Sequence, residues 1–218
     1  MIGAGYSAAT ELAASLGLGN HGVREPASAK VALRELIRTQ RLADSEEARF
    51  EAAHDLCDRF VELPYVRRAR SVALYISGSF EPGTHVIRSA LAARGVNVLL
   101  SVINSSGQLE WFDDPAPPSE RRSPRHTVTS ISAPWRSALD EVSVLLVPAL
   151  AVDTLGRRLG RGSGCYDTVL GSLGPNMLTL AAVYEREVFD AAVEPVPAEC
   201  HDVPIDAVIT PSRVLRLT

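Results

Sequence analysis

The chain of 218 residues has little cysteine and no long apolar run. Its three cysteines, Cys57, Cys165 and Cys200, form no CxxC pair, which argues against a zinc ribbon and a thioredoxin-like motif. An odd cysteine count without a secretion signal is typical of a reducing cytosol, so we expect a cytoplasmic protein. No stretch approaches the roughly 18 apolar residues of a membrane span, so we expect no membrane partner.

The sequence also lacks an excess of positive charge. It has 22 basic and 26 acidic residues, a formal net charge of −4 and only 6% aromatic residues. Such a chain has no general electrostatic field for nucleic acid. The basic residues Lys30, Arg34, Arg38 and Arg41 leave an RNA-binding helix as an alternative, but no aromatic residues are interleaved with them. We therefore expect no nucleic-acid partner.

The chain does contain enough apolar residues, 46%, for one well-buried core. Short apolar runs alternate with helical patterns, and each run is apolar throughout, as in a sheet covered on both faces. We predict a single three-layer α/β/α domain over residues 28–218 with a mostly parallel central sheet. The expected strands are 71–76, 97–103, 108–112, 142–148, 177–183 and 205–210.

The flanking and connecting segments differ in composition. Residues 1–27 are rich in Gly, Ala and Ser, and we expect them to form a mobile N-terminal extension. A helix is predicted to start with Ser28 as its N-cap, with the basic residues on the side opposite its apolar face. A second helix is expected from Ser45 to Val61 and shorter ones from Gly164 to Leu173 and Glu185 to Ala192. Residues 113–135, with five prolines, predict a long surface excursion.

A loop rich in glycine and arginine follows the predicted strand that ends at Pro148. The segment from Val147 to Asp167 reads VPALAVDTLGRRLGRGSGCYD. Glycine lets backbone N–H groups approach phosphate oxygens, and arginine adds charge-assisted hydrogen bonds. Ligands bind at the carboxyl ends of strands in such sheets, so this is a candidate phosphate site. A solvated turn with incidental arginines is the alternative, since neither standard phosphate-loop spacing occurs.

The exact string resembles the signature of the 5-formyltetrahydrofolate cyclo-ligase family, also called 5,10-methenyltetrahydrofolate synthetases. The matching positions are Pro148, Leu150, Ala151, Asp153, Gly156, Arg158, Leu159, Gly160, Gly162, Gly164, Tyr166 and Asp167. Three distant segments resemble the family as well. They are the K-x-x-x-R pair Lys30 and Arg34, the segment around Glu81 and Thr84, and the closing segment with His201, Asp202, Pro204, Asp206, Val208, Thr210 and Pro211.

The resemblance implies an ATP- and Mg²⁺-dependent enzyme that converts 5-formyltetrahydrofolate to 5,10-methenyltetrahydrofolate, releasing ADP and phosphate. It implies ATP and a reduced folate as partners, and we expect a monomer. The implied catalytic residues are Arg158, Arg161 and Tyr166. The implied nucleotide-binding residues are Lys30, Arg34, Arg158, Gly160, Arg161, Gly162, Gly164 and Tyr166. The implied folate-binding residues are Ile76, Glu81 and Tyr166, and the implied Mg²⁺ ligands are Asp167 and Asp202.

Three residues depart from the family pattern. Many relatives carry an aromatic residue at the place of Cys165, some carry Lys or Gly at Ser163, and proline is common at Ser101. Cys165 is not expected to act as a nucleophile, because no histidine is near it in the sequence and the implied chemistry needs no thiol. A non-catalytic nucleotide- or folate-binding protein that keeps the fold is the alternative function.

Overall fold

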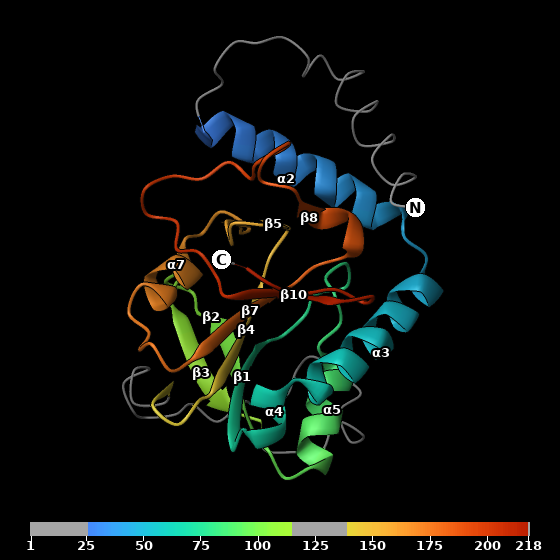
Figure 1. The fold of residues 1–218 in the computed structure, drawn as a ribbon, viewed down its shortest axis with the longest axis vertical. Coiled ribbons are helices and arrows are strands. Elements are labelled where there is room, and N and C mark those ends of the chain that lie inside the picture. Colours follow the sequence, from blue (N-terminus) through green and yellow to red (C-terminus); the bar gives the residue numbers. More distant parts are fainter. Residues whose placement is uncertain (1–25, 115–138, 218) are drawn as a thin grey trace.

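The computed structural model describes residues 26–114 and 139–217 (Figure 1). The expectation of an N-terminal extension therefore lies almost wholly outside the described residues, as does most of the expected excursion at 113–135. Within the described ranges, no helix combines the length and the apolar character that crossing a bilayer requires.

A seven-stranded sheet forms the centre of the described domain, in the order β10-β9-β7-β4-β1-β2-β3. The five inner strands are parallel to one another, while β3 and β10 pair antiparallel at the two edges. This confirms the mostly parallel sheet. The strands are β1 (Ser71–Tyr75), β2 (Asn97–Ile103), β3 (Leu109–Asp113), β4 (Val144–Pro148), β7 (Leu178–Ala182), β9 (Ala207–Ile209) and β10 (Val214–Arg216).

Helices cover the two faces of this sheet. The described helices are α2 (Pro26–Ala43), α3 (Glu46–Glu62), α4 (Pro64–Arg68), α5 (His85–Ala93) and α7 (Cys165–Leu170), with a 3-10 turn η2 (Glu185–Glu187). Figure 1 shows α3, α4 and α5 gathered on one side of the sheet and α7 on the other. The N-cap Ser45 accepts a hydrogen bond from the Ala48 N–H at 3.1 Å, which fixes the start of α3 where the sequence predicted it.

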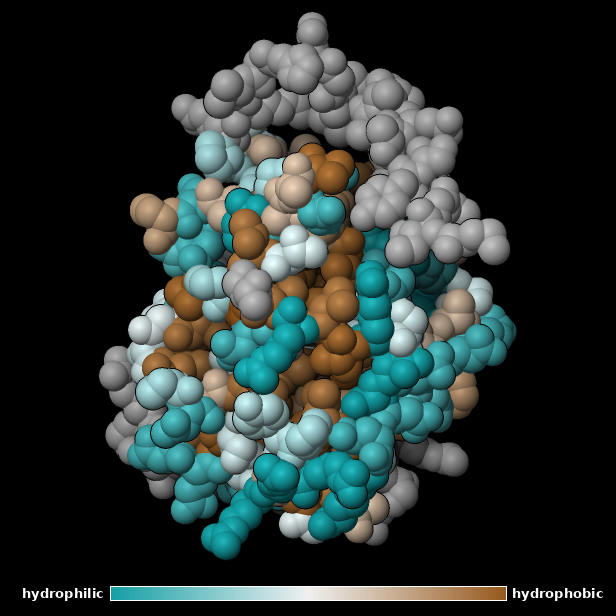
Figure 2. All heavy atoms as spheres, viewed as in Figure 1, coloured by the Kyte–Doolittle hydropathy of each residue, from teal (hydrophilic) through white to brown (hydrophobic). Residues whose placement is uncertain are grey.

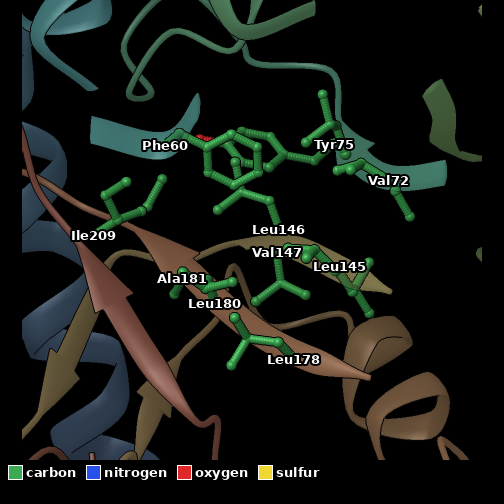
Figure 3. Packing of buried hydrophobic residues seen from close by; sticks show 14 of the residues in the cluster. Phe60, Val72, Tyr75, Leu145, Leu146, Val147, Leu178, Leu180, Ala181 and Ile209 are labelled. Carbon is green, nitrogen blue, oxygen red and sulfur yellow. The ribbon is translucent and has the colours of Figure 1, made fainter. Parts of the chain in front are cut away.

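The core forms on both faces of the inner strands. Along β4, Leu146 points toward the Phe60 ring of α3, and Val147 points to the opposite side (Figure 3). Both residues, and Leu145 beside them, are fully buried. This is the period-two alternation of a strand, and burial on both faces explains why the run is apolar at every position. At the surface, hydrophobic residues show in the middle of the face in Figure 2, between hydrophilic flanks.

A second, three-stranded sheet lies beneath α2. Its strands β5 (Ala151–Asp153), β6 (Arg158–Leu159) and β8 (Val188–Phe189) are arranged in the order β6-β5-β8. Ile37 of α2 packs with Leu150, Leu159 and Val196 in a small apolar cluster of its own. Figure 1 shows α2 crossing above β5 and β8. The loop that matches the family signature is therefore built on this small sheet.

Four local predictions were wrong. The first helix begins at Pro26 and not at an N-cap Ser28, so the expected boundary at residue 27 falls inside α2. The helix expected over 185–192 is only the three-residue turn η2, because residues 188–189 pair with β5. The helix expected over 164–173 ends at Leu170. The basic residues of α2 do not form a separate solvated face, since Lys30 and Arg41 are buried.

Candidate functional site

A pocket of about 760 Å³ opens at the carboxyl ends of the parallel strands. The end of β1 contributes Tyr75, the end of β2 contributes Ser101 and Val102, and the end of β4 contributes Pro148. Its wall contains every site residue expected from the sequence: Lys30, Arg34, Ile76, Glu81, Arg158, Gly160, Arg161, Gly162, Gly164, Tyr166, Asp167 and Asp202. Segments that lie far apart in the sequence thus share one pocket.

Asp153 organises the turn that leads into the loop. Its buried carboxylate accepts hydrogen bonds from the backbone N–H groups of Leu155, Arg157 and Val196. It also forms an ion pair with the Arg157 side chain at 2.6 Å. The Arg157 side chain is therefore bound to Asp153 and does not line the pocket. Gly156 has φ +79°, and a Cβ there would lie 2.6 Å from the Ile205 carbonyl oxygen. These contacts make Asp153 and Gly156 structural residues.

Arg158 is the buried arginine of the loop. Its Nη2 donates to Oδ1 of Asp167 at 2.7 Å, and its Nη1 lies 3.4 Å from the carbonyl oxygen of Pro148. The Nε atom is buried and has no partner among the described residues. A Cβ at Gly160 would lie 2.6 Å from Arg158 Nη1, so glycine there makes room for the guanidinium. Arg158 therefore brings positive charge to the wall and keeps one donor unused.

Lys30 reaches the pocket from α2. Its Nζ lies 2.6 Å from Oε2 of Glu199 and 2.6 Å from Oδ2 of Asp202. Burial alone would lower the pKa of Lys30, but the hydrogen bonds to Asp202 and Glu199 outweigh it, and this pKa is raised. Burial alone would raise the pKa of Asp202, but hydrogen bonds from Lys30 and the Glu199 N–H lower it. Both groups are therefore charged at neutral pH.

Arg34 lies one helical turn after Lys30 and contacts the glycine loop directly. Its Nε donates to the Gly160 carbonyl oxygen at 2.9 Å. Gly162, at φ +110°, would place a Cβ 3.5 Å from the Arg34 guanidinium carbon. The K-x-x-x-R spacing thus puts one cation against the C-terminal carboxylates and the other against the loop, both in the wall of the same pocket.

Glu81 and Arg161 meet at the far side of the pocket. One Glu81 oxygen accepts the Gly78 N–H at 2.7 Å, and the other lies 3.4 Å from Nε of Arg161. Glu81 is buried, whereas the Arg161 side chain is 61% exposed. Ile76, which is 45% exposed, adds an apolar surface next to them. This side of the pocket therefore offers a fixed carboxylate, an apolar contact and a movable cation.

Tyr166 stands between these groups and β2. Its hydroxyl lies 2.6 Å from the hydroxyl of Ser101, whose Oγ also donates to the Leu74 carbonyl oxygen at 3.3 Å. Burial raises the pKa of the Tyr166 phenol well above its ordinary value, although the Ser101 hydrogen bond opposes the shift. Tyr166 is therefore a protonated, fixed side chain. The neighbouring Cys165 Sγ contacts the Gly107 carbonyl oxygen at 2.8 Å, joining the loop to the β2–β3 turn.

A buried ion pair fixes α2 to the domain. Two guanidinium nitrogens of Arg41 donate to the two carboxylate oxygens of Glu187 at 2.7 Å each, and one also donates to the Ala149 carbonyl oxygen. Glu187 in turn accepts the Tyr184 N–H at 2.8 Å. Arg41 thus has a structural role, which its place in a basic series with Lys30 and Arg34 does not reveal.

Asp167 and Asp202 offer the hard oxygen ligands that Mg²⁺ prefers. Both line the pocket, and the N–H of Val203, next to Asp202, lies 3.5 Å from Oδ1 of Asp167. Oδ1 of Asp167 pairs with Arg158, and Oδ2 of Asp202 pairs with Lys30. Oδ1 of Asp202 lies 3.9 Å from Nε2 of His201. Two such carboxylates suit a cation that also takes ligands from a nucleotide. Within the described residues, no group of three or more His, Cys, Asp or Glu side chains could hold a metal alone.

Sequence reasoning missed Glu199 as a site residue and underestimated Ser101. Glu199 precedes Asp202 by three residues in a proline-rich turn, and only its contact with Lys30 marks it. Ser101 departs from the family pattern, and its contact with Tyr166 became visible only with the register of β2.

The chain is similar to known proteins of one family. The 5-formyltetrahydrofolate cyclo-ligase family matches over residues 26–211. A 5-formyltetrahydrofolate cyclo-ligase of Mycolicibacterium smegmatis is 34% identical over 151 residues, covering 66% of this chain and 75% of the relative. One from Escherichia coli K12 is 32% identical, covering 82% of this chain and 98% of the relative. A 5,10-methenyltetrahydrofolate synthetase of Aquifex aeolicus has the same fold, with TM-score 0.68, 23% identity, and 86% and 92% of the two chains covered.

Proposed function

Because the chain belongs to the 5-formyltetrahydrofolate cyclo-ligase family, we propose that it catalyses the ATP-dependent closure of 5-formyltetrahydrofolate to 5,10-methenyltetrahydrofolate. The observation that carries the proposal is the meeting of two unlike surfaces in one pocket. The cations Lys30, Arg34 and Arg158 line one side, and Glu81 with Ile76 lines the other. The first set suits a polyphosphate and the second suits the polar edge and flat face of a pterin.

The proposed chemistry solves a leaving-group problem. The oxygen of a formamide is a poor leaving group. In the first step the formyl oxygen attacks the γ-phosphorus of ATP, and the bond from phosphorus to ADP breaks. In the second step N10 attacks the formyl carbon, the C–N bond forms, the C–O bond breaks, phosphate leaves and N10 loses its proton. The products are the methenyl compound, ADP and phosphate.

The residues divide this work by position. Lys30 and Arg34 hold the ATP phosphates. Arg158, with a buried and unpartnered Nε, neutralises charge on the transferring group. Mg²⁺ bound with the nucleotide supplies further neutralisation of the phosphates, and Asp167 and Asp202 would hold it.

Arg161 is proposed to act where the two substrates meet. It belongs to the phosphate loop, yet its side chain already contacts Glu81 on the opposite side of the pocket. Its exposure leaves it free to move toward a bound phosphoryl group, while Glu81 and Ile76 orient the pterin. Tyr166, held by Ser101, shapes the wall beside them. Catalysis in this scheme is chiefly positioning and charge stabilisation, as in other phosphoryl transfers.

A direct assay tests the proposal. The protein is mixed with 5-formyltetrahydrofolate, ATP and Mg²⁺, and the absorbance of the methenyl product is followed, with a reaction lacking ATP as control. Product that forms only with ATP supports the proposal. Folded protein that binds ATP and folate but gives no product at high enzyme concentration would instead support the non-catalytic binding protein.

A further inference from the structure

We infer that Glu199 is a positioning residue for nucleotide binding, which acts by holding the Lys30 ammonium in place. The inference rests on the proposed function, in which Lys30 binds the ATP phosphates and Asp202 binds Mg²⁺. Glu199 is assigned neither to the ATP phosphates nor to Mg²⁺, and it lines the pocket.

The geometry links three residues in one small cluster. Lys30 Nζ is equally close, at 2.6 Å, to Glu199 Oε2 and to Asp202 Oδ2. The same Asp202 oxygen accepts the backbone N–H of Glu199 at 2.6 Å. The side chains of Lys30 and Asp202 are 7% and 15% exposed, whereas that of Glu199 is 37% exposed. Lys30 is thus fixed between two carboxylates, of which Asp202 is the less exposed and Glu199 the more exposed.

In the absence of ligand, one carboxylate would be enough to balance the charge of Lys30, and two are present. An ammonium group has three hydrogens to donate, and two of them are used on Glu199 and Asp202. When Asp202 is engaged by Mg²⁺, its negative charge is no longer free to offset Lys30. Glu199 then remains as the partner that keeps the ammonium oriented, and the hydrogens not used on Glu199 become available to phosphate oxygens.

A purely structural role for Glu199 makes a different prediction. In that case the Glu199–Lys30 pair only fastens α2 to the C-terminal turn, and its loss lowers stability without changing affinity for ATP. Since the pair is partly exposed, this stabilisation would be small. The two roles are separated by measuring ATP affinity and thermal stability on the same variants.

The test compares Glu199→Gln, Lys30→Met and the double variant, with Glu194→Gln as the matched control, because Glu194 is an exposed glutamate of the same segment. The dissociation constant for ATP is measured by titration calorimetry with Mg²⁺ present and folate absent. We expect Glu199→Gln to weaken ATP binding about five- to tenfold, the loss of roughly one hydrogen bond to a charged group. The KM for 5-formyltetrahydrofolate should change less than about twofold, and Glu194→Gln should match the wild type.

The double variant provides the decisive comparison. If Glu199 acts through Lys30, adding Glu199→Gln to Lys30→Met causes no further loss of ATP affinity. An unchanged ATP dissociation constant in Glu199→Gln, with only a lower melting temperature, would overturn the inference, as would fully additive losses. Wild-type protein that binds ATP without turnover contradicts the proposed function but leaves this test intact. Wild-type protein that does not bind ATP contradicts both.

Discussion

The guanidinium of Arg158 and the carboxylate of Asp167 form an ion pair of 2.7 Å in the wall of the pocket. The side chains are 3% and 16% exposed, so the pair is largely shielded from water. The two residues lie on different elements, Arg158 on β6 and Asp167 on α7. In the proposed function Arg158 binds phosphate and Asp167 binds Mg²⁺. Without ligands, the charges of the two side chains balance each other.

Replacing either member of this pair should remove activity. Arg158→Ala and Asp167→Ala are each expected to lower turnover by about 100-fold or more while the domain stays folded, because in the proposed function Arg158 neutralises the transferring phosphate and Asp167 holds Mg²⁺. Arg67→Ala is the control, since Arg67 of α4 is exposed, forms a 3.7 Å ion pair with Glu62 and does not line the pocket. Turnover is measured by product absorbance and folding by circular dichroism. Wild-type rates in either pocket variant would remove that residue from its proposed role.

The Ser101–Tyr166 hydrogen bond should contribute measurably to stability. In Ser101→Ala the buried Tyr166 hydroxyl loses its partner, and we expect the free energy of unfolding to fall by about 1–2 kcal/mol. Tyr166→Phe should remove the same interaction, so the double variant should be more stable than the sum of the single losses implies. Denaturant unfolding measures all three. Ser106→Ala, in the exposed β2–β3 turn, serves as control, and strictly additive losses would show that the two hydroxyls do not interact in solution.

The Lys30–Asp202 pair should stabilise the fold over a defined pH range. The pKa of Asp202 is lower in the folded chain than its ordinary value of 3.8, so its contribution is present above that value and is lost as pH falls through the folded pKa. The pKa of Lys30 is higher than its ordinary value of 10.5, so its contribution is lost as pH rises through the folded pKa. The difference in unfolding free energy between wild type and Asp202→Asn should therefore be constant from about pH 5 to about pH 9 and shrink at both extremes.

Chemical denaturation across this pH range makes the measurement. Asp140→Asn is the control, because Asp140 is exposed and has no ion pair among the described residues. Its difference from the wild type should not depend on pH in the same way. A constant difference between wild type and Asp202→Asn below about pH 4 would show that Asp202 titrates as it does in the unfolded chain.

Alanine substitutions at three glycines should separate two reasons for a glycine: a positive φ angle and a lack of space for a Cβ atom. Gly156 combines a positive φ of +79° with a blocked Cβ position, Gly95 has φ +71° in open space, and Gly174 has neither constraint. We expect alanine to cost about 1 kcal/mol at Gly95, more than about 2 kcal/mol at Gly156, and close to nothing at Gly174. Unfolding free energies provide the test, and equal costs at Gly95 and Gly156 would show that the Ile205 carbonyl can move aside.

Much of the fold could be predicted because the inner strands are buried on both faces. The strands around Leu74, Leu146 and Leu180 are apolar except for Ser71 and Thr179, and this composition is typical of parallel strands covered on both faces. The small sheet could not be predicted in this way. Its strands have two or three residues, too few to show the alternation of a strand. The charged residue Arg158 also makes β6 look unlike a buried strand in the sequence. The same shortness led to the wrong helix after Glu185.

The composition of the site was predictable, but its pairing was not. The family resemblance selected Lys30, Glu81, Asp167 and Asp202, and all four line one pocket. Nothing in the sequence shows that Lys30 contacts Asp202, because helical periodicity distinguishes faces of a helix but not their distant partners. For that reason Glu199, the other partner of Lys30, was not recognised from the sequence.

The contact between Lys30 and Asp202 joins residues 172 positions apart. During synthesis, α2 leaves the ribosome long before the turn at 199–202 exists, so its buried lysine has neither carboxylate partner at that stage. Contacts of such large sequence separation form late and at a high entropic cost. The side of the pocket that is proposed to bind the nucleotide is therefore expected to be among the last parts of the domain to form, because it needs the turn at 199–202.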